Sequence, residues 1–204
     1  MTEIASIHPT AALPPIHPLI VRLTHWINAA AILVMIASGW EIYNASPILP
    51  FHFPLTLGGW LGGALLWHFA AMWVLVVNFI LFAGYGLLSG RYRRKLWPIR
   101  PRDILADIRA ALRGHLSHAD PSQYNAVQKL LYAGVLGLIV LVIVSGVAIW
   151  KPVQLQALTA LFGGFQGARL VHFLAMSGIA LFVVVHVIMA LIVPRTILAM
   201  LRGR

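Results

Sequence analysis

Four long apolar runs constrain this chain more than any other feature of its sequence. They cover residues 21–40, 58–82, 130–150 and 170–193. A helix needs about 20 residues to cross the hydrocarbon core of a bilayer, and backbone groups in lipid must be hydrogen-bonded within the chain. Composition agrees, because 60% of the 204 residues are hydrophobic and only 10% are charged. We therefore predict an all-α fold: an integral membrane four-helix bundle over residues 17–204, after a flexible N-terminal segment of residues 1–16.

The basic residues indicate how these helices are oriented. The formal net charge is +10, and eight lysines and arginines lie between residues 91 and 113, in the connection between the second and third runs. Basic connections stay on the cytoplasmic side. We therefore predict an N-in/C-in topology, with a short amphipathic helix beginning near Asp103 along the inner membrane surface. The charge follows topology, so we predict contact with membrane lipid and no nucleic-acid binding.

Histidines are the candidates for chemistry in this chain. There is no cysteine, which excludes disulfides, iron-sulfur clusters and thioether-linked haem. Four of the nine histidines fall within the apolar runs: His25, His68, His172 and His186. Ionisable groups are costly in lipid and are functional candidates there. A metal in this membrane domain would therefore be held by histidine.

The spacing of the four histidines predicts two pairs. His172 and His186 are 14 residues apart on one predicted helix, so they share a face within roughly 40° and lie about 21 Å apart in depth. With the predicted topology, His25 is at the depth of His186 near the inner surface. His68 is nearer the depth of His172 towards the outer surface, although straight ideal helices leave this second match several ångströms short.

Two imidazoles facing each other between helices are suited to a haem with two axial histidines. A zinc ion would normally need four ligands at one depth. We therefore predict two b-type haems, with axial pairs His25/His186 and His68/His172, and one-electron transfer as the chemistry. The alternative is that these histidines only bond neighbouring helices, in a haem-free membrane anchor or assembly protein.

Two further sets of residues favour a cofactor. Arg22 and Arg169 each lie three residues before a histidine, in the similar sequences Arg-Leu-Thr-His-Trp and Arg-Leu-Val-His-Phe, and could bind haem propionates. The alternative for both is contact with lipid headgroups. Gly39 and Gly146, each preceded by serine, could leave room for a porphyrin, although small residues also mediate plain helix contacts.

With these residues in view, the chain resembles the bacterial cytochrome b561 and nickel-iron hydrogenase cytochrome b family. That family includes formate dehydrogenase gamma subunits and thiosulfate reductase-like cytochrome b subunits. The resemblance runs from Ile16 and is carried by the Arg22–Trp26 sequence, His68, the segment 124–129, and the pair His172 and His186. It implies the same histidine pairing, the bacterial inner membrane as location, and quinone as an exchangeable substrate. The quinone candidates are Tyr124, Asn125, Gln128 and Lys129, for which the alternative is a solvated helix cap.

These observations and the resemblance favour one function and leave another open. The first is electron transfer between the quinone pool and a redox partner at the outer face, for example a periplasmic molybdenum oxidoreductase. The second is a stand-alone cytochrome b561 that acts as a superoxide:quinone oxidoreductase, with Lys151 and Arg169 attracting the anion.

Overall fold

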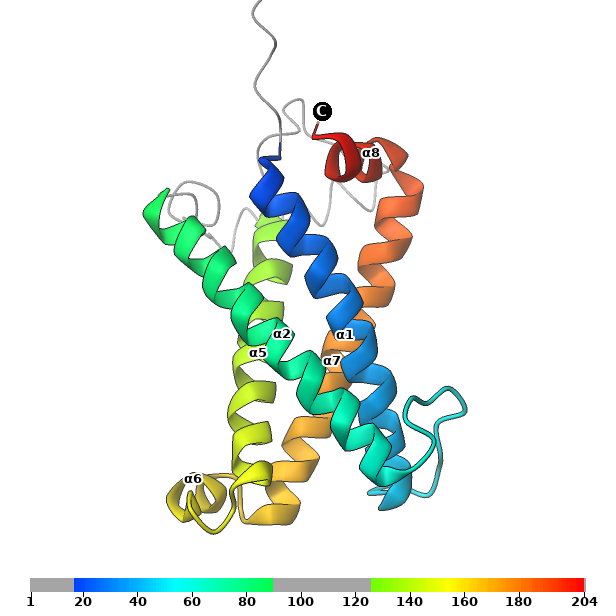
Figure 1. Cartoon of the computed structure of the whole chain (residues 1–204), viewed down its shortest axis with the longest axis vertical. Coiled ribbons are helices and arrows are strands. Elements are labelled where there is room, and N and C mark those ends of the chain that lie inside the picture. Colours follow the sequence, from blue (N-terminus) through cyan, green and yellow to red (C-terminus); the bar gives the residue numbers. More distant parts are fainter. Residues whose placement is uncertain (1–16, 90–125, 204) are drawn as a thin grey trace, which may run out of the picture.

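The chain is folded as a bundle of four long helices. A computed structural model describes residues 17–89 and 126–203, and within these ranges it contains helices and connections but no strand. The long helices are α1 (Leu19–Ala45), α2 (Leu61–Leu88), α5 (Ala126–Trp150) and α7 (Phe165–Ile192) (Figure 1). All four are long and apolar enough to cross a membrane, which confirms the predicted helical membrane bundle.

The long helices are arranged as two pairs. Close backbone contacts form mainly between α1 and α2 and between α5 and α7, and Figure 1 shows the first pair lying over the second. Small side chains allow these contacts, because Ala64 on α2, Ala148 on α5 and Ala168 on α7 are fully buried. Contacts between the two pairs of helices include two pairs of histidine rings.

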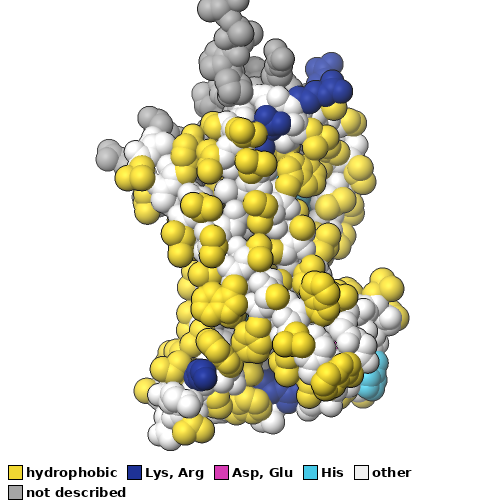
Figure 2. Space-filling model, in the orientation of Figure 1, with side chains coloured by type: hydrophobic (Ala, Val, Ile, Leu, Met, Phe, Trp, Pro, Cys, Tyr) yellow, Lys and Arg dark blue, Asp and Glu magenta, His cyan; other side chains and the backbone are white. Residues whose placement is uncertain are grey.

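Apolar side chains cover the outside of the bundle. Leu66, Val140 and Leu181 are 74%, 62% and 66% exposed. On the face drawn in Figure 2, hydrophobic side chains extend over the middle, and lysine and arginine gather at the two ends. Such a surface matches a bilayer in both its apolar band and its charged ends. The chain is therefore a multi-pass membrane protein.

Two short helices add to the predicted set. α6 (Gln156–Leu161) connects α5 to α7, and Thr159 on α6 donates a hydrogen bond to the carbonyl of Ala148. α8 (Pro194–Arg202) follows α7 with proline at its start and Gly203 in a left-handed conformation at its end. The predicted amphipathic helix near Asp103 and the N-terminal segment 1–16 lie outside the described residues.

Aromatic side chains fix the connection between α1 and α2 at one end of the bundle. The ring of Trp40 stacks on Phe53 with centres 4.7 Å apart, and the ring of Tyr43 stacks on Phe173 at 4.9 Å. Asn44 both donates to and accepts from the backbone of Phe53, at 2.9 Å. Since Phe173 follows His172, this cluster ties the connection to the part of α7 that carries a candidate ligand.

Candidate cofactor site

The structure brings the four intramembrane histidines together as two pairs. The ring centres of His25 and His186 are 6.0 Å apart, and those of His68 and His172 are 6.4 Å apart. In each pair the two rings come from different helices, α1 and α7 in the first and α2 and α7 in the second. Helix α7 therefore contributes one histidine to each pair.

The helix boundaries explain why each pair meets at one depth. His25 lies six residues after the first residue of α1, and His186 lies six residues before the last residue of α7. His68 lies seven residues into α2, and His172 lies seven residues into α7. The poorer match expected for the second pair came from predicted helix starts at residues 58 and 170, whereas α2 begins at Leu61 and α7 begins at Phe165.

Serine side chains contact both histidines of the second pair. Nδ1 of His68 is 3.0 Å from Oγ of Ser38, and Nδ1 of His172 is 3.3 Å from Oγ of Ser145. The carbonyl oxygen of Val142 is also 3.0 Å from Nδ1 of His172. Sequence reasoning singled out the glycines after these serines and missed the serines themselves.

Gly39 and Gly146 lie against the same two rings. A Cβ atom added to Gly39 would be 3.5 Å from Cε1 of His68, and one added to Gly146 would be 3.1 Å from Cε1 of His172. In this structure the missing side chains therefore make room for the histidine rings. Their predicted role beside a porphyrin stays a prediction.

The first pair has different surroundings. Nδ1 of His25 is buried and has no hydrogen-bond partner within the described part of the chain. The ring of Trp26 meets the His25 ring edge-on with centres 5.2 Å apart. His186 is exposed, and its ring stacks on Phe182 at 5.9 Å. This pair therefore has aromatic neighbours where the other has serine hydroxyls.

The two arginines near the pairs are engaged with backbone carbonyls. Arg22 donates hydrogen bonds to the carbonyls of Met200 and Leu201 at the end of α8. Arg169 donates to the side chain of Gln166 and to the carbonyl of Ser46. Their predicted contact with haem propionates stays a prediction.

The quinone candidates fall at the edge of the described residues. Tyr124 and Asn125 lie outside them, and Gln128 and Lys129 belong to the first turn of α5. The quinone site therefore also stays a prediction.

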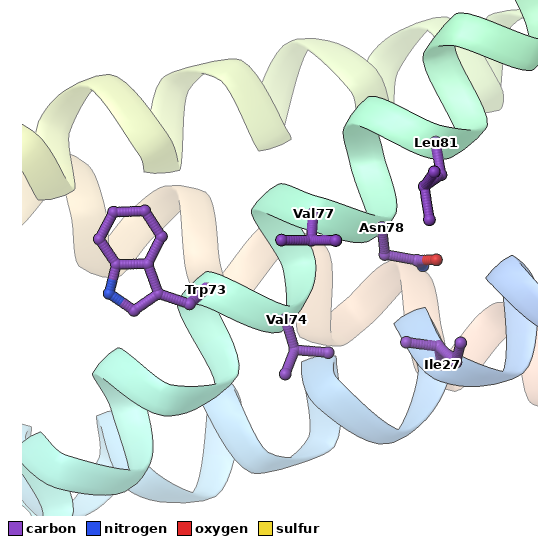
Figure 3. Close-up of a pocket in the computed structure, with 6 residues that line it drawn as sticks. All are labelled: Ile27, Trp73, Val74, Val77, Asn78 and Leu81. Atoms are coloured by element: carbon purple, nitrogen blue, oxygen red, sulfur yellow. The ribbon is translucent and has the colours of Figure 1, made fainter.

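A buried asparagine links α1 and α2 inside the bundle. Asn78, which is 3% exposed, donates to the carbonyl of Thr24 at 2.7 Å and to Oδ1 of Asn28 at 2.6 Å. Beside it lies an open apolar groove of about 400 Å³ (Figure 3), lined by Ile27, Trp73, Val74, Val77, Asn78 and Leu81. The groove contains none of the four paired histidines, so we assign it no redox chemistry.

Fold and site together define a class: multi-pass membrane proteins that pair imidazoles between their helices. Comparison with known families then identifies the particular one. The family model described as prokaryotic cytochrome b561 matches residues 16–203, and the chain belongs to this family.

Two relatives are similar over most of their length. One, from Azospira oryzae, is named as a protein-methionine-sulfoxide reductase subunit, YedZ1, and is 50% identical over 92% of this chain and 96% of its own. The other is the cytochrome b556(fdo) subunit of formate dehydrogenase from Escherichia coli K12. It is 27% identical over 89% of this chain and 81% of its own. Both names describe subunits of redox enzymes.

The family implies haem b, and the geometry of the histidines can be tested against that group. A metal–nitrogen bond to imidazole is about 2 Å long and the ring nitrogen lies about 1 Å from the ring centre, so two imidazoles on opposite sides of one iron have centres about 6 Å apart. The observed 6.0 Å and 6.4 Å match this separation. In addition, Nδ1 of His25 is buried without a hydrogen-bond partner among the described residues. The residues fit the group.

Proposed function

We propose that this chain is an electron-transfer subunit of the bacterial inner membrane that holds two b-type haems. His25 and His186 would bind one near the inner face, and His68 and His172 would bind the other near the outer face. When bound, each haem would supply a one-electron iron couple, with these histidines as the residues that hold it. The observation that carries the proposal is the presence of two imidazole pairs with ring centres 6.0 Å and 6.4 Å apart.

The ligand sets favour haem over zinc. A structural zinc site has four protein ligands, and a catalytic one usually has three. Among the described residues, no group of three or more histidine, cysteine, aspartate or glutamate side chains is placed to hold a metal ion. Each pair offers two imidazoles, which is the number that a haem with two axial histidines requires.

Helix α7 supports transfer across the membrane. Its two histidines are 14 residues apart, so they are separated by about 21 Å along the helix axis and point in similar directions. Large apolar side chains are exposed on the outside of the bundle, as a lipid-facing surface requires. The chain itself would therefore hold the two sites at fixed depths, one towards each face.

The two ends of this path would meet different partners. We place quinone near the inner pair, with Tyr124, Asn125, Gln128 and Lys129 as its candidate contacts. We place a redox protein, for example a periplasmic molybdenum oxidoreductase, at the outer face. Support for such a partner comes from the relatives, whose names describe subunits of a reductase and a dehydrogenase.

The same comparison favours a subunit over a stand-alone superoxide:quinone oxidoreductase. The two cations predicted to attract superoxide also have contacts of their own. The ammonium group of Lys151 lies 4.9 Å from the ring centre of Trp150, and Arg169 donates to Gln166 and Ser46. The superoxide reaction therefore stays a prediction without support from a specific contact.

The test is a reduced-minus-oxidised spectrum with haem quantified per chain. We expect two b-type haems in the purified wild-type protein and about one in each of His68→Ala and His186→Ala, because each variant loses one axial ligand of one pair. His52→Ala is the matched control, since His52 is an exposed histidine in the connection between α1 and α2. Folded wild-type protein without haem would contradict the proposal.

A further inference from the structure

Ser38 and Ser145 occupy equivalent places in the two helix pairs. Ser38 on α1 contacts His68 on α2, and Ser145 on α5 contacts His172 on α7. Both serines are completely buried, and each is followed by a glycine that lies against the same histidine. The two pairs therefore repeat one contact, in which a Ser-Gly step of one helix holds a histidine of its neighbour.

The hydroxyl group of each serine donates its proton to a backbone carbonyl of its own helix. Oγ of Ser38 is 2.6 Å from the carbonyl oxygen of Val34, and Oγ of Ser145 is 2.6 Å from that of Leu141. A hydroxyl has one proton to donate, so each serine oxygen can only accept from the histidine. Nδ1 of both histidines must therefore carry a proton in these contacts.

A backbone carbonyl gives the same result independently for His172. The carbonyl oxygen of Val142, three residues before Ser145, is 3.0 Å from Nδ1 of His172 and accepts a hydrogen bond from it. A carbonyl oxygen cannot donate, so Nδ1 is again the protonated nitrogen. In both rings Nε2 is then the nitrogen with a free lone pair, as an iron ligand requires.

Among the described residues, the inner pair lacks this arrangement. Nδ1 of His25 has no hydrogen-bond partner among the described residues, and the nearest described ring contacts of this pair are Trp26 and Phe182. The described contacts of the two histidine pairs therefore differ, although their ring separations are similar.

We infer that Ser38 and Ser145 are positioning residues for the outer haem, fixing His68 and His172 in the Nδ1–H form with Nε2 directed to iron. This inference rests on the proposed function. A hydrogen bond from Nδ1–H makes the imidazole a stronger donor to the metal and fixes its orientation. A stronger donor stabilises ferric iron, so these bonds lower the reduction potential of the outer haem and increase its retention.

The test is a redox titration of the purified full chain carrying Ser38→Ala or Ser145→Ala. We expect the midpoint potential of the outer haem to rise in each variant and to rise further in the double variant, while that of the inner haem is unchanged. The midpoint potential that belongs to the outer haem is identified as the one that disappears from the titration of His172→Ala. We also expect outer-haem retention to fall about tenfold in Ser38→Ala, the effect typical of losing such a hydrogen-bond partner. The fall should be smaller in Ser145→Ala, because the carbonyl of Val142 still accepts from Nδ1 of His172.

Ser177→Ala is the matched control. Ser177 also donates to the carbonyl four residues earlier, that of Phe173, at 2.8 Å, but it lies about 140° around α7 from His172. It should leave both potentials unchanged. The inference is wrong if both serine variants keep the wild-type outer potential and retention, or if both haems shift equally. Failure of the proposed function would give a different result from failure of this inference, because the wild-type protein itself would then lack the second haem.

Discussion

The ring of His172 lies against the backbone of Gly146 so closely that a Cβ atom on this glycine would be 3.1 Å from Cε1 and 3.3 Å from Nδ1. A Cβ atom added to Gly39 would be 3.5 Å from Cε1 of His68, which is an ordinary van der Waals contact. The two glycines therefore differ in how much room they leave, although both follow a buried serine.

This difference predicts unequal effects of adding a methyl group. Gly146→Ala should displace the His172 ring and reduce outer-haem content, whereas Gly39→Ala should retain most of it. Gly137→Ala is the control, because Gly137 lies on the opposite side of α5 from Gly146 and its added Cβ would meet nothing within 4 Å. Haem per chain and the redox titration measure the effect. Equal loss in Gly39→Ala would contradict the prediction and indicate that a porphyrin fills the space beside Gly39.

The proposed topology can be tested with single cysteines, because the chain has none of its own. Leu55→Cys lies in the α1–α2 connection, where Leu55 is 72% exposed, and Leu198→Cys lies on α8, where Leu198 is 44% exposed. In intact cells with a permeable outer membrane, an impermeant maleimide should label position 55 and should label position 198 only after lysis. The reverse pattern would overturn the N-in/C-in prediction.

Much of the fold could be predicted because the bilayer fixes helix length and the helical period fixes which residues share a face. The sequence could not define where α7 begins, since its first turns, with Gln166 and Arg169, extend beyond the apolar run. The fourth apolar run was predicted to end at residue 193, and α8 was not predicted, although proline at position 194 suits the first position of a new helix.

The histidine pairs could be predicted from spacing, whereas the groups that hold the outer pair could not. A serine within a helix usually bonds the carbonyl four residues earlier, as Ser38 and Ser145 do. Whether such a serine also contacts a histidine depends on how two helices pack against each other. The periodicity of a single helix does not contain that information. The repeated Ser-Gly step was the available signal, but it was interpreted only through its glycines.

Asn78 should stabilise the contact between α1 and α2. Its amide donates to Thr24 and to Asn28 from a nearly fully buried position, so Asn78→Ala removes two interhelical hydrogen bonds. We expect a loss of roughly 1–3 kcal/mol in the free energy of unfolding. Asn28→Ala removes only one of the two bonds and should cost about half as much. Thermal unfolding in detergent, followed by circular dichroism, measures both, and equal stability of the three proteins would contradict this role.

Arg22 should hold α8 in place. Its guanidinium donates to the carbonyls of Met200 and Leu201, where the last turn of a helix carries partial negative charge. Arg22→Gln should therefore weaken hydrogen-exchange protection across residues 194–203 a few-fold, corresponding to roughly 1 kcal/mol. Arg195→Gln is the control, because it removes one positive charge from α8 and leaves the hydrogen bonds of Arg22 to Met200 and Leu201 in place.

The same variant separates this role from the predicted contact with a haem propionate. If Arg22 acts only on α8, the inner haem should stay at its wild-type content and potential while protection of α8 falls. Loss of inner haem with unchanged protection of residues 194–203 would instead indicate that Arg22 leaves the α8 carbonyls for a propionate when haem is bound. The carbonyl contacts favour the first outcome, because each bonded guanidinium nitrogen would have to exchange a backbone acceptor for the propionate.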